Sequence, residues 1–195
     1  RDMLAKNSVL ESLTLNSPES PDEASVVSWR KTLPFIRDST TLKSFTFALD
    51  ERDGITYDSH VTTLCVDTVA TLAGNTTLEC LDIKIGTISP DTYCSALESL
   101  QPYTTVKTLR LSPVLASMGE EEMEQVVSLV KKNYSLAFLD EGLSALDKTG
   151  ELGTLLRLNQ AGRRYLIEDK ASIAKGVKVS IGVSEDLGCL FYHLL

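Results

Sequence analysis

The sequence predicts an α/β fold in which a helix and a short strand alternate several times along the chain. Two observations predict it: an internal repeat of apolar positions, and a change of apolar spacing within each copy from three or four residues to two. The 195 residues are 43% apolar and 24% charged, which is typical of a folded protein with one core.

The repeat becomes visible when the chain is aligned on five anchor positions. Four positions are compared in each copy: the residue three before the anchor, and the residues three, six and eight after it. The anchors are Asn7, Ser39, Asn75, Tyr103 and Asn133. Nineteen of the twenty compared positions are apolar, with Glu141 as the exception. The composition alone would give about nine. With Thr or Ser two residues after most anchors, the unit is N-x-T-L-x-x-L-x-L.

The two spacings within the unit predict a helix before each anchor and a strand after it. Apolar residues three or four apart predict helices near residues 26–36, 61–72, 94–100 and 123–130. The L-x-L step has the two-residue period of a strand with one buried face. Stacked copies would form a parallel strand layer on the concave side of a horseshoe, with helices outside. The central inward row should be Leu13, Phe45, Leu81, Leu109 and Leu139.

Local signals place the ends of the helices. Ser20, Ser89 and Ser117 each stand where a helix should begin, and a serine side chain there can accept a hydrogen bond from a free backbone N–H group. Pro34 should kink or end the first helix. Residues 48–57 are rich in Asp and Gly and predict the longest loop.

This L-x-x-L-x-L unit with an alternating helix, at a period near 28, resembles the leucine-rich repeat in its ribonuclease-inhibitor-like form. The resemblance covers residues 4–158. Residues 152–164 are similar to the L-x-L-N-x-x-G-R ending of the last repeat helix in tropomodulin-like, NOD-like and some algal leucine-rich-repeat proteins. The resemblance implies repeats over residues 1–160, and a last repeat helix at 149–160 that ends with Gly162 in the left-handed conformation. A helical cap at 161–195 would follow, with short helices near 171–178 and 185–195.

One departure from the family pattern concerns the residue that follows the last leucine of each unit. The family usually carries Asn or Cys there, and this chain does not. No cap precedes the first repeat, and we expect further repeats upstream.

Residues between the inward leucines should point to the concave surface and bind a protein partner. Arg110 and Phe138 are the expected anchors, because Arg and aromatic side chains dominate binding at protein interfaces. A merely solvated face remains the alternative, and Phe138 could instead pack under the C-terminal cap. The candidate partner-binding residues are Thr14, Asn16, Thr46, Asp82, Lys84, Thr108, Arg110, Phe138 and Asp140.

Charge and motifs argue against several function classes. A net charge of −8 disfavours nucleic acid and membrane surfaces, and no apolar run approaches the ~20 residues that span a bilayer. No zinc-ligand spacing and no glycine-rich nucleotide motif is present. We therefore expect no cofactor, metal or small-molecule substrate. Asn75 and Asn133 match the glycosylation acceptor, yet both coincide with repeat anchors and should be structural.

The first hypothesis is a non-enzymatic protein–protein interaction module. Four cysteines without a CxxC pair, and no apolar stretch after the charged first residues, favour an intracellular, cytoplasmic location. A second hypothesis is a structural spacer or cap in a larger regulator or receptor. A third is a cysteine-dependent hydrolase, because Cys189 and His193 stand four apart on one predicted helical face.

Overall fold

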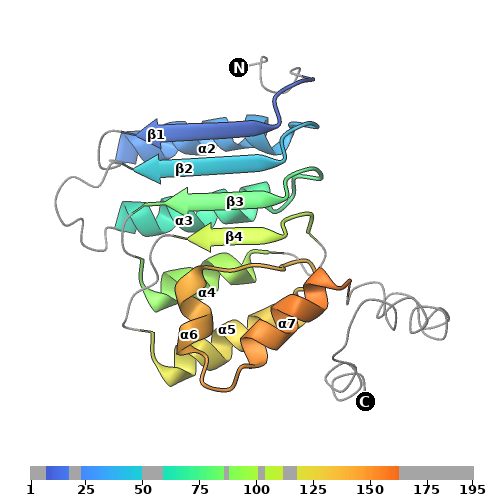
Figure 1. The fold of residues 1–195 in the computed structure, drawn as a ribbon. Coiled ribbons are helices and arrows are strands. Elements are labelled where there is room, and N and C mark those ends of the chain that lie inside the picture. The colour runs from blue at the N-terminus through green and yellow to red at the C-terminus, as the bar shows by residue number, and fades with distance from the viewer. Residues whose placement is uncertain are drawn as a thin grey trace.

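The fold is seen in a computed structural model that describes residues 8–17, 23–49, 59–85, 88–100, 104–111 and 118–162. Strands and helices alternate along most of the described residues, and two further helices follow the last strand–helix pair (Figure 1). The elements are β1 (Ser12–Ser17), α2 (Glu23–Arg37), β2 (Ser44–Leu49), α3 (Ser59–Leu72), β3 (Cys80–Lys84), α4 (Pro90–Glu98), β4 (Thr108–Leu111), α5 (Glu120–Lys132), α6 (Glu141–Leu146) and α7 (Glu151–Gln160). The alternation confirms the α/β class.

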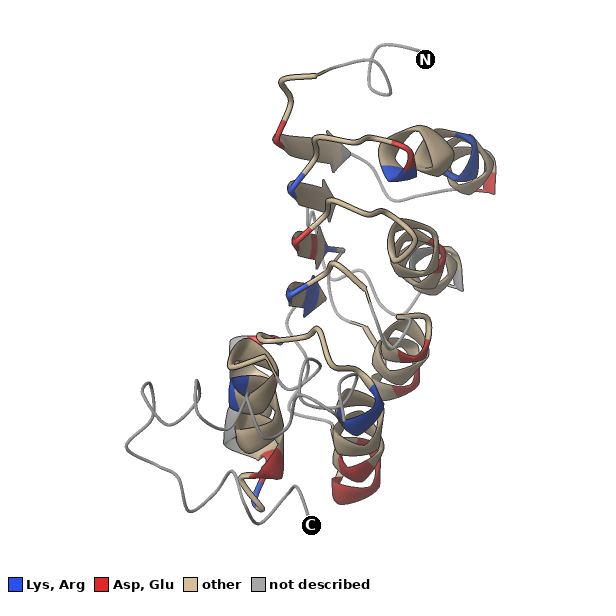
Figure 2. Cartoon of the chain, turned by 90° about the vertical axis from the view of Figure 1, so that its right-hand side faces the viewer, with Lys and Arg blue, Asp and Glu red and all other residues tan. Residues whose placement is uncertain are grey.

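The four strands form one parallel sheet in the order of the sequence, β1-β2-β3-β4. A helix joins each strand to the next, as parallel neighbours require. Figures 1 and 2 show the strands in one layer and helices α2 to α5 in a second layer on one side of it. The opposite side of the sheet is called the open face below.

Equivalent inward residues of successive strands lie side by side, as the repeat predicts. Phe45 pairs with Leu13 on one side and with Leu81 on the other, and Leu81 pairs with Leu109. Phe45, Leu81 and Leu109 have no exposed surface, and Leu139 is 3% exposed. Leu13 is only partly buried, because no described residue pairs with the outer edge of β1. This row is the centre of the core.

The fifth copy of the unit is not a strand. Its only strand-like pairing among the described residues is a single parallel bridge between Phe138 and Thr108. Glu141, the one polar residue at an inward position of the repeat, instead begins α6. A carboxylate in the dry layer between sheet and helices would be costly, so the chain turns away before that position.

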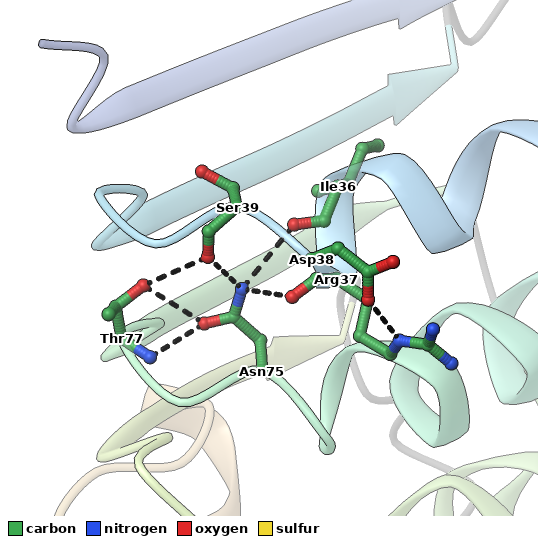
Figure 3. Close-up of polar contacts among 6 residues, drawn as sticks. All are labelled: Ile36, Arg37, Asp38, Ser39, Asn75 and Thr77. Atoms are coloured by element: carbon green, nitrogen blue, oxygen red, sulfur yellow. Dashed lines mark hydrogen bonds and ion pairs between the residues drawn. The ribbon is translucent and has the colours of Figure 1, made fainter. Parts of the chain in front are cut away.

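Buried polar side chains join successive units at the edge of the sheet where the strands begin. Asn75 is 3% exposed, and its Nδ2 donates to the carbonyls of Arg37 at 2.6 Å and Ser39 at 2.9 Å (Figure 3). Its Oδ1 accepts from the backbone N–H groups of Thr77 and Leu78, both at 2.7 Å. One side chain therefore holds the end of one unit and the turn of the next.

The same arrangement recurs further along the chain. Asn133 Oδ1 accepts from the backbone nitrogens of Ser135 and Leu136 at 2.9 Å. Asn159 Nδ2 donates to the carbonyls of Asn133 and Leu136 at 2.9 and 2.7 Å. Thr41, Thr77 and Thr105 each donate a hydroxyl to a carbonyl of the preceding unit. Asn75 and Asn133 are thus structural, as predicted, and their side chains bond the turns at the anchors. The positions where the family carries Asn or Cys after the last leucine lie outside the described residues.

Pro34 does not end the first helix, although an end there was one of the two outcomes that the sequence predicted. Helix α2 continues through it to Arg37. Leu33 and Ile36 on either side are each 1% exposed. Their burial against the sheet outweighs the single helical hydrogen bond that a proline removes.

The predicted helix starts have different outcomes. Ser89 caps α4 as expected and accepts from the Thr92 nitrogen at 3.1 Å. The Ser117 prediction is wrong, because α5 begins at Glu120 with Gly119 as its N-cap. Residues 48 and 49 of the predicted long loop belong to β2, since the alternating burial of that strand continues to Leu49. Ser20 and the rest of that loop lie outside the described residues.

The last repeat helix matches its prediction closely. α7 begins at Glu151, two residues later than expected, after Gly150 with φ of 70°. Gly162 has φ of 91°, the left-handed conformation that was predicted to end the helix. The predicted cap beyond Gly162 lies outside the described residues. Among the described helices, none combines the length and apolar character needed to cross a membrane.

Truncating Leu81 tests the inward row. Leu81→Ala should lower the free energy of unfolding by about 2–5 kcal/mol, because the side chain is fully buried between Phe45 and Leu109. Urea unfolding followed by circular dichroism measures this. Val27→Ala, at a 43% exposed position, is the control. A loss below about 1 kcal/mol at Leu81 would contradict the inward assignment.

Removing the Asn75 side chain tests the polar ties. Asn75→Ala should cost at least about 3 kcal/mol, because it leaves several buried backbone groups without partners. Asn16→Ala, at an exposed strand position, is the matched control and should cost less than about 0.5 kcal/mol. Equal losses at the two positions would show that the Asn75 bonds do not hold the units together.

Candidate functional site

The open face carries the outward side chains of the four strands in rows that cross the sheet. The central row is Thr14, Thr46, Asp82 and Arg110, each paired in register with the next. A second row is Ser12, Ser44, Cys80, Thr108 and Phe138. A third is Asn16, Ala48 and Lys84. The structure thus brings eight of the nine candidate residues onto one face.

The two halves of this face differ in charge. Every outward residue of β1 and β2 is uncharged, whereas β3 and β4 carry Asp82, Lys84 and Arg110. The Asp82 side chain is 9% exposed, and its carboxylate lies 3.4 Å from Lys84 Nζ. The Lys84 side chain is 62% exposed. The carboxylate therefore lies low against the sheet while the ammonium group reaches into solvent.

Arg110 and Phe138 form the second notable contact of the face. The guanidinium carbon of Arg110 lies 5.1 Å from the centroid of the Phe138 ring, within the range of a cation–π contact. Phe138 is half-buried and reaches this position through its bridge to Thr108. The two residues predicted as binding anchors are therefore in contact with each other.

Asp140 does not lie in these rows of outward strand residues, contrary to its predicted placement. Its two carboxylate oxygens accept from the backbone nitrogen of Leu111, each at 3.1 Å, and Oδ2 also accepts from the hydroxyl of Tyr93 at 3.0 Å. Tyr93 comes from α4 and is fully buried. The carboxylate replaces the backbone carbonyl that a fifth strand would have offered to Leu111, so Asp140 closes the edge of the sheet.

Burial around Asp140 raises several pKa values. Burial raises the pKa of Asp140, as does the negative charge of Asp82, against the opposing effect of the hydrogen bonds from Leu111 and Tyr93. Burial, followed by the charge of Asp140, raises the pKa of Tyr93 and raises that of the Cys65 thiol to about 12. A thiol with such a pKa is a poor nucleophile at neutral pH, so Cys65 is a core residue.

The sequence reasoning missed a groove of about 590 Å³ along the edge where the strands begin. Two rows of equivalent repeat positions line much of it: the hydroxyls Thr40, Thr76 and Thr104, and the alternating charges Glu11, Lys43, Glu79 and Lys107. Figure 2 views the sheet from this end and shows the red and blue alternation. The signal was present in the sequence as a charge that alternates in sign at the position four residues after each of the first four anchors.

The charges of the groove largely neutralise one another. Lys43 Nζ lies 2.8 Å from Glu11, and Lys107 Nζ lies 3.1 Å from Glu79, with all four side chains more than half exposed. Such exposed pairs contribute little to stability. The groove offers a partner no net charge, in contrast to the open face.

The described residues include no group of three or more His, Cys, Asp or Glu side chains placed to hold a metal ion. Cys65, Cys80 and Cys94 are free thiols. Burial raises the pKa of Cys94 to about 11, followed by smaller effects of Asp91, Glu98 and Glu122. Cys189 and His193, the pair of the hydrolase hypothesis, lie outside the described residues.

Sequence comparisons give no relative for the chain. No protein-family model matches it. A search of curated proteins gives no match either. The function must therefore follow from the geometry and charge of the surfaces described above.

The raised pKa of Asp140 predicts a pH-dependent stability. The folded protein keeps this proton to a higher pH than the unfolded chain, whose carboxyl has an ordinary pKa of 3.8. The stability of the wild type relative to Asp140→Asn should therefore be greatest below that value and fall as pH rises through the folded pKa. Urea unfolding of both proteins between about pH 4 and about pH 8 measures the difference. A wild type that gains on the variant with rising pH would show that the Leu111 and Tyr93 bonds outweigh burial.

Proposed function

We propose that the chain is a segment of a leucine-rich-repeat solenoid of the ribonuclease-inhibitor-like form, and that it acts as a non-enzymatic protein-interaction module. The open face would be the concave surface of the solenoid. The in-register apolar row, the strand–helix alternation and the repeated Asn and Thr bonds between units support this fold. We place the module inside the cell, in line with the three free thiols among the described residues.

The observation that carries the binding proposal is the contact between Arg110 and Phe138 on a regular sheet. The parallel register fixes the spacing of the outward side chains, so a partner meets a preformed surface. Arg and aromatic residues are enriched among those that contribute most to binding. Thr14, Thr46 and Thr108 would supply hydroxyl contacts around this centre.

A paired substitution tests the open face. Asp82→Ala together with Arg110→Ala should weaken binding to a partner recovered with the wild-type chain by at least about tenfold. Glu124→Ala with Lys132→Ala is the matched control, because it removes one acidic and one basic exposed side chain on α5 and leaves the net charge unchanged. Calorimetry with the purified partner measures the affinities, and thermal unfolding shows that each variant folds.

The control variant should bind like the wild type. If the open-face variant also binds normally, the partner uses another surface. A chain that is only a structural spacer would likewise show no dependence on the open-face side chains.

A further inference from the structure

The exposed charge of the open face is positive although the chain as a whole carries −8. Lys84 and Arg110 reach solvent, while Asp82 lies buried against the sheet. Among the described residues, no carboxylate lies within ion-pair distance of Arg110, whose contact is with the Phe138 ring. The outward positions of β1 and β2 add no charge of either sign. The outward residues of the four strands therefore present two exposed cations and one buried carboxylate, that of Asp82.

The spacing of the two cations restricts the ligand. Arg110 pairs in register with Asp82, and Lys84 stands two residues further along β3. With strands about 4.8 Å apart and a rise of about 3.3 Å per residue, such diagonal positions are about 8 Å apart. In an extended peptide, side chains on the same face are separated by two residues, or about 6.6 Å. Two carboxylates at alternate positions of an extended segment match this distance.

We propose that the open face binds an extended acidic peptide of the form Asp/Glu-x-Asp/Glu, with one carboxylate on Arg110 and the other on Lys84. This inference rests on the proposed function and names the chemistry of its partner. The guanidinium is held against Phe138 and can donate two parallel hydrogen bonds to a carboxylate at a small entropic cost. Lys84 can reach a ligand carboxylate while its Nζ stays beside Asp82, because the lysine side chain is 62% exposed.

The rest of the face sets the direction of the peptide. The uncharged hydroxyl rows of β1 and β2 suit a polar, uncharged flank, whereas a carboxylate there would find no cation. Buried Asp82 lies between the two cations in the pattern and repels a third carboxylate placed over it. The acidic pair should therefore be confined to one end of the bound segment.

Three fluorescent nonapeptides that differ only at the two alternate positions test the proposal. They carry Glu, Gln or Lys at both positions, on the same Gly/Ser background, and binding is followed by fluorescence anisotropy. The Glu peptide should bind, and the Gln and Lys peptides should bind at least about tenfold more weakly. Higher salt should lower the affinity for the Glu peptide, because the contact is between exposed charges.

Variants of the protein locate the contact. Arg110→Ala and Lys84→Ala should each lower the affinity for the Glu peptide by at least about fivefold. Arg110→Lys should not restore full affinity, since lysine lacks the planar fork. Lys132→Ala removes the same charge from α5 and should leave binding unchanged. Circular dichroism verifies that all variants fold.

Amide chemical shifts separate the two ways in which the proposal can fail. Shifts at Thr46, Asp82 and Arg110 with equal affinity for all three peptides would keep the open face as a binding surface but overturn the acidic assignment. Glu-peptide binding that survives Arg110→Ala and Lys84→Ala, or shifts confined to Thr76 and Thr104 in the groove, would also overturn it. No binding of the Glu peptide up to about 1 mM would do the same. None of these results would decide the proposed function, which is tested separately by the affinity of the Asp82→Ala, Arg110→Ala variant for a recovered protein partner.

Discussion

The lateral stacking of equivalent apolar side chains is the constraint on which the rest of this structure depends. A single helix and strand of this length cannot bury their apolar faces, so each unit becomes stable only when its neighbour covers it. Phe45, Leu81 and Leu109 show the result, since each lies beside its counterpart and none is exposed to solvent. Once this row is fixed, the two-residue period of a strand determines which side chains reach the open face.

Hydrogen bonds decide where the stack is tied and where it ends. Asn75 joins two units because one amide group can donate to one turn while it accepts from the next. At the outer edge of β4, the Asp140 carboxylate accepts a hydrogen bond from the Leu111 N–H group, which a further strand would otherwise have bonded. The carboxylate of Asp140 thus replaces the backbone pairing of a further strand. The chain then continues into α6 instead of along the sheet.

The sequence was informative wherever a pattern repeats and less so where a single residue departs from it. The inward row, the helices and the placement of Arg110 beside the open-face residues follow from spacing alone. The continuation of α2 through Pro34 to Arg37 depends on the burial of Leu33 and Ile36, which local propensity does not encode. Asp140 was misplaced because the repeat was extended by one strand, although Glu141 had already broken the apolar pattern. The burial of Asp82 and the contact between Arg110 and Phe138 depend on three-dimensional packing that periodicity does not encode.

Nuclear Overhauser contacts among the inward side chains test the register most directly. In a protein with labelled methyl and aromatic groups, Leu81 should show contacts to both Phe45 and Leu109, which are 36 and 28 residues away in the chain. Contacts from Leu13 to Phe45 should extend the same row. If Leu81 instead contacts only residues near it in the sequence, the units do not stack in this register, and the open face described above does not exist.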